Sequence, residues 1–219
     1  MAARSFFAPM LLIYKEKGIS SFKLLQKIKQ KCSYKKLGHT GTLDPLAEGL
    51  LIVLTDTETK KQQEFMGLDK EYEAIARLGI QTTTGDLEGK LIKTRGCNLS
   101  EEQITNALLS LQGEHLWEVP LYSAIKVNGK PLYKYARENK QVEIPRKKMQ
   151  IFNIQLISIN RKTQHTDVHF KVKVSSGTYI RTITEKLGEK LNCPATTTLI
   201  KRTKIGSYSL KDALRLNEL

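Results

Sequence analysis

The chain has 219 residues and carries 36 Lys and Arg against 22 Asp and Glu, a net charge of +14 with a pI near 9.6. This length allows one large domain or two small ones, each with a substantial core. Few enzymes that act on small molecules carry such an excess, so the charge predicts attraction to a polyanion, nucleic acid before membrane. The alternative is a generically basic soluble protein.

The N-terminal apolar run, residues 6–14, is interrupted by Pro9 and is too short to span a membrane. It lacks a cleavage site of small residues, so we interpret it as a strand. Cys32, Cys97 and Cys193 are far apart and odd in number, which argues against a disulfide framework and a zinc site. By elimination we expect a cytoplasmic protein without a membrane segment.

The first half of the chain predicts one helix and two further strands. Ser20 and Ser21 open the helix. Its expected apolar face consists of Phe22, Leu25, Ile28 and Cys32. The apolar run 50–54 is typical of a fully buried strand, and alternation over 72–78 indicates another.

The second half predicts a helix, a hairpin and two long strands. The helix starts at Ser100, where Gln103 completes a capping box. Its expected inward residues are Ile104, Leu108 and Leu111. Asn128-Gly129 is a strong two-residue turn after a strand at 123–127. Period-two alternation predicts strands at 149–159 and 167–174.

These elements predict an α+β fold with a largely antiparallel, mixed β-sheet flanked by helices. The strands arrive mostly in hairpin-like pairs, and the helices fall between them at irregular intervals. No internal repeat, low-complexity tract or Gly/Ser/Pro-rich linker divides the sequence. We therefore expect a single domain over residues 1–219.

The loop 38–51, with the sequence GHTGTLDPLAEGLL, is the most informative segment. Three glycines and Pro45 favour a tight turn, and the following apolar run predicts a core strand behind it. In one interpretation, Asp44 merely caps a short turn that begins at Pro45. In the other, the braced loop holds Asp44 as a reactive carboxylate, beside His39.

The whole string resembles the signature of the TruB-type tRNA pseudouridine synthases, in which the aspartate of Gly-His-Thr-Gly-x-Leu-Asp-Pro is catalytic. Further blocks follow in the family's order and extend the resemblance from about residue 10 to residue 209. They are KEYEA (70–74), RLG (77–79) with TTTGD (82–86), PLYSAIK (120–126), GKPLYKYAR (129–137) and SGTYIRT (176–182).

The resemblance implies an isomerase that converts a tRNA uridine, at position 55 in the T loop, to pseudouridine. This reaction needs no cofactor or metal, and the sequence contains no P-loop, dinucleotide fingerprint or metal-ligand spacing. The implied partner is the tRNA T stem-loop, without a nucleotide cofactor, and we expect a monomer. Two alternatives are a non-catalytic tRNA-binding and folding chaperone, and a synthase retargeted to another RNA.

The resemblance also assigns site residues. Asp44 is the catalytic carboxylate, and Arg181 is the cation that pairs with it. Tyr72 is implied as both a catalytic and a substrate-binding residue, because it stacks on the flipped uracil with its hydroxyl near the proton on C5. Tyr179 lines the uracil pocket. Two more positions contact the substrate: His39 enters the space vacated by the base, and Ile200 stands where the family usually has leucine.

Basic residues are expected to contact the RNA backbone, which positions RNA without reading its sequence. The candidates are Lys35, Lys36, Lys60, Lys134, Arg137, Lys201 and Arg202. Individually, each is better explained as an ordinary solvated side chain.

Two departures from the family pattern stand out. Tyr14-Lys15-Glu16 replaces the common Asp-Lys-Pro, although Lys15 is retained. Bacterial members usually continue into a small C-terminal RNA-binding domain, and we expect no separate domain of that kind within these 219 residues.

Overall fold

The computed structural model describes residues 8–163 and 165–219, so Phe6 and Phe7 of the first expected strand lie outside the described residues. The chain forms two compact units. Unit 1 comprises the described residues up to Glu73 together with Leu199–Leu219, and unit 2 comprises Ala74–Thr198. The expectation that residues 1–219 form a single domain stays a prediction.

The strands of unit 1 are hydrogen-bonded in the order β1-β3-β12. β1 (Met10–Lys15) pairs antiparallel with β3 (Glu48–Thr55), whereas β12 (Ala195–Ile205) pairs with β3 in parallel. The short strands β2 (Leu37–His39) and β13 (Tyr208–Ser209) pair with β3 and β12. The helical segments are α1 (Ser21–Lys31), α2 (Gln62–Met66) and the 3₁₀ turns η1 (Asp56–Lys61), η2 (Leu210–Asp212) and η3 (Leu216–Glu218).

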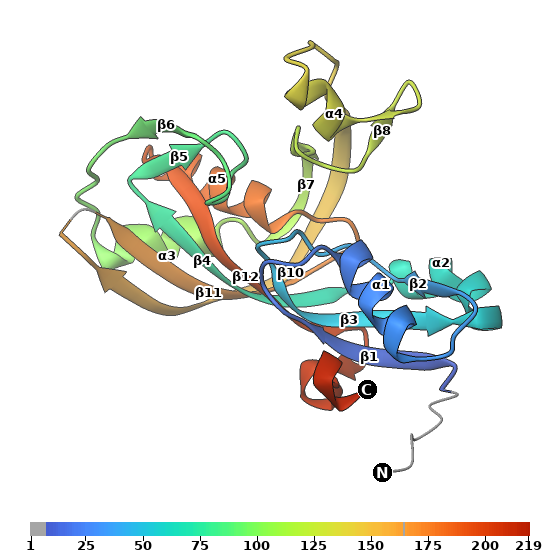
Figure 1. Cartoon of the computed structure of the whole chain (residues 1–219). Helices are drawn as coiled ribbons and strands as arrows, with labels where there is room; N and C mark the ends of the chain where they lie inside the picture. The colour runs from blue at the N-terminus through green and yellow to red at the C-terminus, as the bar shows by residue number, and fades with distance from the viewer. Residues whose placement is uncertain (1–7, 164) are drawn as a thin grey trace. The chain divides into compact units, whose positions relative to one another are not determined.

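Strand β3 is buried on both faces, as its apolar run predicts. Leu51 and Val53 pack in one cluster with Leu24 and Ile28 of α1, which lies beside the strands of unit 1 in Figure 1. The opposite face of β3 forms a second cluster, which contains Leu50, Ile52, Leu54 and Ile205, with Phe65 and Leu68 packed against it. A strand enclosed in this way is a firm support for the loop that precedes it.

Helix α1 begins where expected, but its buried side differs from the predicted one. Ser20 is the N-cap and accepts a hydrogen bond from the Lys23 amide at 3.2 Å. The buried residues are Ser21, Leu24 and Ile28, whereas Phe22 is 68% exposed. The prediction that Phe22 faces the core was wrong, because the helix is turned to place the Ser21 hydroxyl against the backbone of another segment.

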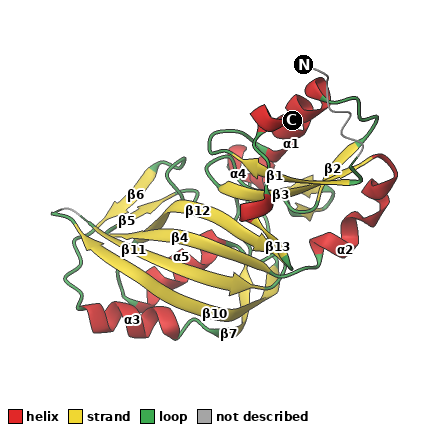
Figure 2. Cartoon of the chain, turned by 90° about the horizontal axis from the view of Figure 1, so that it is seen from below, coloured by secondary structure: helices red, strands yellow, loops and turns green. Residues whose placement is uncertain are grey.

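The strands of unit 2 follow the order β12-β4-β11-β10-β7, where β4 (Lys70–Leu78) and β12 each contribute residues to both units. β10 (Arg146–Arg161) pairs antiparallel with β11 (Thr166–Val174) and with β7 (Gly113–Glu118), as Figure 2 shows. Two small sheets join β5 (Ile80–Thr82) to β6 (Leu91–Thr94) and β8 (Lys126–Val127) to β9 (Lys130–Pro131). The helices of unit 2 are α3 (Glu101–Leu109), α4 (Leu132–Arg137) and α5 (Ile180–Lys190).

These pairings confirm the α+β class with a mostly antiparallel sheet. The local signals of unit 2 are confirmed as well. Ser100 and Gln103 form the capping box of α3, with hydrogen bonds of 2.8 and 3.1 Å. Asn128 and Gly129 both have positive φ and form the turn between β8 and β9. No helix in the described part of the chain is long and apolar enough to cross a bilayer.

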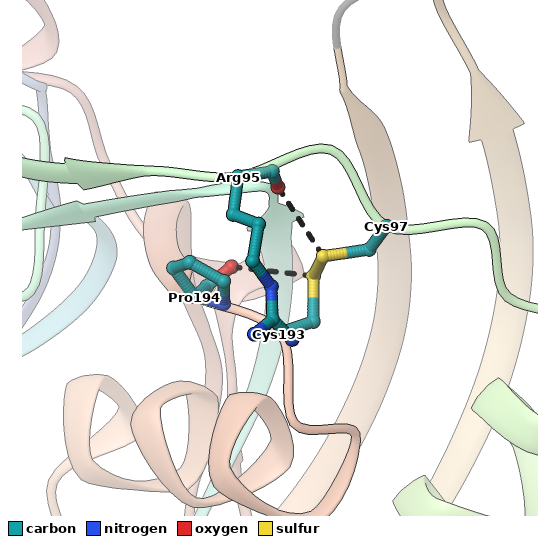
Figure 3. Close-up of a disulfide and its surroundings, with 4 residues drawn as sticks. All are labelled: Arg95, Cys97, Cys193 and Pro194. Carbon is teal, nitrogen blue, oxygen red and sulfur yellow. Dashed lines mark hydrogen bonds between the residues drawn. A yellow bond between two sulfur atoms is a disulfide. The ribbon is translucent and has the colours of Figure 1, made fainter.

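Cys97 and Cys193 form a disulfide, which contradicts the prediction that the cysteines do not pair (Figure 3). Their Cα atoms lie 6.0 Å apart, although 96 residues separate them in sequence. The fold explains this approach through Gly79: its carbonyl accepts from the Arg95 amide at 2.8 Å, and its amide donates to the Pro194 carbonyl at 2.7 Å. The segment after β6 is thereby held against the turn that leads from α5 into β12.

Candidate active site

The loop between β2 and β3 presents Asp44 at a tight turn. The Asp44 carbonyl accepts a hydrogen bond from the Ala47 amide at 3.0 Å, and Pro45 occupies the position after Asp44. Gly41 and Gly49 have φ values of +145° and +112°, which side chains other than glycine rarely adopt. Asp44 is half-buried, so the loop leaves part of this residue exposed.

Two buried polar side chains hold the backbone on either side of Asp44. The Ser21 hydroxyl accepts a hydrogen bond from the Leu43 amide at 3.0 Å and lies 3.1 Å from the Leu43 carbonyl, to which it donates. The fully buried Lys15 ammonium donates to the Ala47 carbonyl at 2.6 Å and to the Pro45 carbonyl at 3.4 Å. Asp44 therefore sits on a backbone that is fixed immediately before and after it.

Arg202 lies within unit 1 and is 1% exposed. Its Nε donates to the Leu50 carbonyl at 2.8 Å, and its Nη2 donates to the Gly41 carbonyl at 3.0 Å. This burial contradicts the prediction that Arg202 contacts the RNA backbone. The prediction failed because β12 places this position in the core, where the guanidinium donates to carbonyls at the two ends of the Asp44 loop.

His39, at the end of β2, is half-buried beside the same loop. Its carbonyl accepts from the Gln62 side-chain amide at 2.9 Å, and its Nδ1 is buried without a hydrogen-bond partner among the described residues. Burial first, and the charge of Arg202 second, lower the pKa of His39 below its usual value of 6.5. The imidazole is therefore neutral at pH 7.

Two further expected substrate residues lie in unit 1. Tyr72 is on β4 and is 7% exposed, on the face of the strand where alternate residues are buried. Ile200 is on β12 and is 9% exposed. Each therefore presents only a small exposed surface, and contact of either side chain with a base stays a prediction.

Arg181 belongs to unit 2, where the start of α5 buries it to 3% exposure. Its guanidinium donates to the Thr84 carbonyl at 2.8 Å and to the Tyr122 carbonyl at 3.0 Å. Its Nε lies 3.8 Å from Oδ2 of the buried Asp86. The sequence predicted neither Asp86 nor the two carbonyls as partners, although Asp86 ends the TTTGD block. Pairing of Arg181 with Asp44 of unit 1 stays a prediction.

Two neighbours of Arg181 on the same helix complete this part of unit 2. Tyr179 is the N-cap residue of α5, and it packs against a cluster of Val119, Leu132 and Met149. The Glu185 carboxyl lies one turn after Arg181. Burial raises its pKa, and the positive charge of Arg181 partly offsets this rise. A Cβ on Gly85 would lie 2.6 Å from Glu185 Oε1, so the carboxyl borders the TTTGD loop directly.

The other candidate RNA-backbone residues lie at or near the surface. Lys35, Lys36, Lys60, Lys134 and Arg137 are exposed, and Lys201 is half-buried. The backbone amides of Lys35 and Lys36 both donate to Asp56 Oδ1 at 2.9 Å, which fixes their segment while leaving the ammonium groups in solvent. Contact of any of these residues with RNA stays a prediction.

The described residues, 8–163 and 165–219, contain no group of three or more His, Cys, Asp or Glu side chains arranged to hold a metal ion. Unit 1 brings His39, Asp44 and the buried supports Lys15, Ser21 and Arg202 to one loop. Ser21 was not predicted as a support, because a serine at a helix start is normally explained by capping.

Residues 29–180 match the family model described as TruB family pseudouridylate synthase (N terminal domain). The chain is 42% identical to tRNA pseudouridine synthase B of Burkholderia pseudomallei (strain 668) over 217 residues, 99% of this chain and 70% of that protein. It is 40% identical to the protein of the same name from Haemophilus influenzae, covering 96% of this chain and 66% of that one.

The fold is also similar to a solved structure. A chain in the crystal structure of a Cbf5-Nop10-Gar1 complex matches with a TM-score of 0.73 and 24% identity, covering 96% of this chain and 53% of that chain. At this identity the likeness concerns the fold.

Proposed function

The chain belongs to the TruB family of pseudouridylate synthases, and on that premise we propose that it isomerises a tRNA uridine to pseudouridine, at position 55 in the T loop. The observation that carries this proposal is family membership over most of the chain, together with a fixed loop that presents Asp44. The high net charge of +14 supports a polyanionic substrate.

The reaction rearranges one nucleotide without a net change in atoms. The bond between ribose C1′ and uracil N1 breaks, the base turns, and a new bond forms between C1′ and C5. The hydrogen on C5 leaves as a proton, and N1 gains one. A positioned anion and a site that holds the loose base are therefore the main requirements.

Asp44 supplies the anion. Its carboxylate either attacks the sugar or base, or removes the ribose C2′ proton. The support for this role is mechanical: Ser21 holds the residue before Asp44, and Lys15 holds the carbonyls of two residues after it. A nucleophile or base held in this way loses little entropy when it reaches the transition state.

Arg181 is the cation that keeps Asp44 ionised when RNA excludes water from the site. The guanidinium is preorganised in unit 2 by the Thr84 and Tyr122 carbonyls and by Asp86. These contacts engage Nη1, Nη2 and Nε, and a guanidinium presents five N–H groups in a planar fork, so one such cation can serve more than one carboxylate.

The extruded uracil packs between apolar surfaces. Tyr72 stacks on the base, and Ile200 and Tyr179 line its pocket. The neutral imidazole of His39 fills the space that the base leaves in the RNA loop, where a charged ring would lose hydration.

Release of tritium from tRNA labelled at uridine C5 tests the proposal. The wild-type protein is expected to release one equivalent, and none from a transcript whose T-loop uridine 55 is replaced by cytidine. Asp44→Asn is nearly isosteric but cannot act as an anionic nucleophile or base, so it should bind tRNA and release no tritium.

Each other result points to a different function. Binding without release by the wild-type protein would indicate a tRNA-folding chaperone. Release from the cytidine-55 transcript would indicate a different target uridine, and release by a pure Asp44→Asn preparation would remove Asp44 from the mechanism.

A further inference from the structure

Arg202 joins the two ends of the segment that carries Asp44. Its guanidinium donates to the carbonyl of Gly41, three residues before Asp44, and to the carbonyl of Leu50, six residues after it. One planar group therefore fixes the separation between the start and the end of the catalytic loop. A guanidinium can do this because its donors project in fixed directions from a rigid plane.

The backbone of Arg202 is fitted to the same segment. Arg202 pairs with Gly49 in the parallel β3–β12 ladder. A Cβ on Gly49 would lie 2.3 Å from the Arg202 carbonyl oxygen and 2.7 Å from its amide nitrogen, so only glycine allows the strands to come this close. The β3–β12 pairing thus fixes the point from which the Arg202 side chain reaches the loop.

The charge of Arg202 is retained at a site where burial is expensive. In the described part of the chain, the partners of this guanidinium are backbone carbonyls and not a carboxylate. Carbonyl groups solvate the cation without neutralising it, so its field reaches the loop above, including His39. A purely structural link between two carbonyls would not require a full charge.

We propose that Arg202 is a positioning residue for the reaction, which fixes the Asp44 loop through Gly41 and Leu50 and holds a positive potential beneath it. This inference rests on the proposed function. It differs from RNA-backbone binding, because a side chain that is 1% exposed and donates to two backbone carbonyls is not accessible to an RNA phosphate.

Two substitutions separate geometry from charge. Arg202→Lys keeps the charge but loses the fork, and Arg202→Met removes both. Arg77→Met serves as a control for general destabilisation, because it breaks the bidentate Arg77–Asp167 pair in unit 2 and leaves the loop alone. Each variant is assayed at a temperature where circular dichroism shows it folded.

The kinetic test uses single turnovers of C5-tritiated tRNA at saturating enzyme. Arg202→Met is expected to lose about a hundredfold in rate, the effect of displacing a reacting group by about 1 Å, while tRNA affinity changes by less than about threefold. Arg202→Lys should recover part of the rate, and Arg77→Met should keep the wild-type rate. A folded Arg202→Met with the wild-type rate, or one whose defect lies in tRNA affinity alone, would overturn the proposal.

Two readouts without substrate test the same idea, and the first of them does not need Arg202→Met to fold. Hydrogen exchange in peptides covering 40–49 should be faster in Arg202→Lys than in wild type, and unchanged in Arg77→Met. NMR titration should show a higher His39 pKa in Arg202→Met, where the cation is gone. If the wild-type protein released no tritium, the proposed function would fail, and unchanged exchange in 40–49 would separately overturn the positioning role.

Discussion

Ser21 and Leu43 are joined by two hydrogen bonds that share one hydroxyl. The Leu43 amide donates to Ser21 Oγ at 3.0 Å, and the same oxygen donates to the Leu43 carbonyl at 3.1 Å. Both backbone groups of the residue before Asp44 are therefore satisfied by a side chain 22 positions away. Movement of Leu43 would leave a buried donor and acceptor unpaired, so this contact couples the start of α1 to the catalytic loop.

Removing this hydroxyl should affect both stability and turnover. In Ser21→Ala, we expect the free energy of unfolding to fall by about 1–3 kcal/mol, because two buried backbone groups lose their partner. Turnover of C5-tritiated tRNA should fall further than the folded fraction explains. Urea titration and single-turnover assays measure the two effects.

Ser20→Ala is the matched control for that experiment. It removes only the exposed cap, a hydrogen bond of 3.2 Å to the Lys23 amide, and such caps contribute about 0.5–2 kcal/mol. Equal losses of turnover in the two variants would mean that Ser21 acts through helix stability and not on the loop.

Arg181→Met should strongly impair both the fold of unit 2 and catalysis. The substitution leaves Asp86 buried without its cation, and breaking a buried pair typically costs about 3–5 kcal/mol. Arg181→Lys should recover only part, because an ammonium cannot reach Thr84, Tyr122 and Asp86 with the geometry of a guanidinium. Thermal unfolding and tritium release measure the two losses.

Asp86→Asn separates the effect of Arg181 on the stability of unit 2 from its effect on catalysis. It weakens the ion pair in unit 2 while leaving the Arg181 charge in place. If Arg181→Met kept the wild-type rate over pH 6–9, the proposed pairing with Asp44 would be wrong.

The half-buried carboxyl of Glu185 should make stability fall as pH rises. Burial raises the pKa of Glu185 above its usual 4.5 in the folded state, so between these values the folded protein binds more protons than the unfolded chain. Stability is then largest below the unfolded pKa and decreases as pH rises through the folded pKa. Glu185→Gln removes this dependence, so its melting temperature relative to wild type should increase with pH.

Glu189→Gln removes an exposed carboxylate beside Lys186 that also raises the Glu185 pKa, so it should weaken this pH dependence only in part. His39 contributes the opposite slope: its lowered pKa makes the fold lose stability as pH falls below about 6.5. A parallel pH profile for wild type and Glu185→Gln would show that Glu185 is ionised at no cost.

Local signals in the sequence predicted the elements that the structure confirms. The run 50–54 predicts a strand buried on both faces, because an uninterrupted apolar segment has no side that favours water. The Ser100–Gln103 box likewise predicts the start of α3, since both of its hydrogen bonds lie within four residues.

The features that the sequence could not predict depend on contacts between distant segments. Phe22 is exposed because the Ser21–Leu43 contact sets the rotation of α1, and this contact joins two separate elements. Cys97 and Cys193 meet because Gly79 binds both of their segments, which no cysteine spacing reveals. Arg202 looks like a surface cation in a basic stretch, and only the β3–β12 pairing turns it inward.

Binding of tRNA should be electrostatic and should weaken with salt through identifiable lysines. The net charge of +14 and the exposed ammonium groups of Lys35 and Lys36 predict a linear fall of log affinity with log salt, about 0.7–0.9 per phosphate contact. Replacing both lysines with Gln should reduce this slope by about 1.4–1.8 if each contacts one phosphate. The modified uridine should stay the same, because phosphate contacts position RNA without reading it.

Replacing Lys162 and Lys190, which are also exposed, removes the same charge from other places and should change the slope little. Equal slope changes in the two double variants would mean that only the overall charge matters.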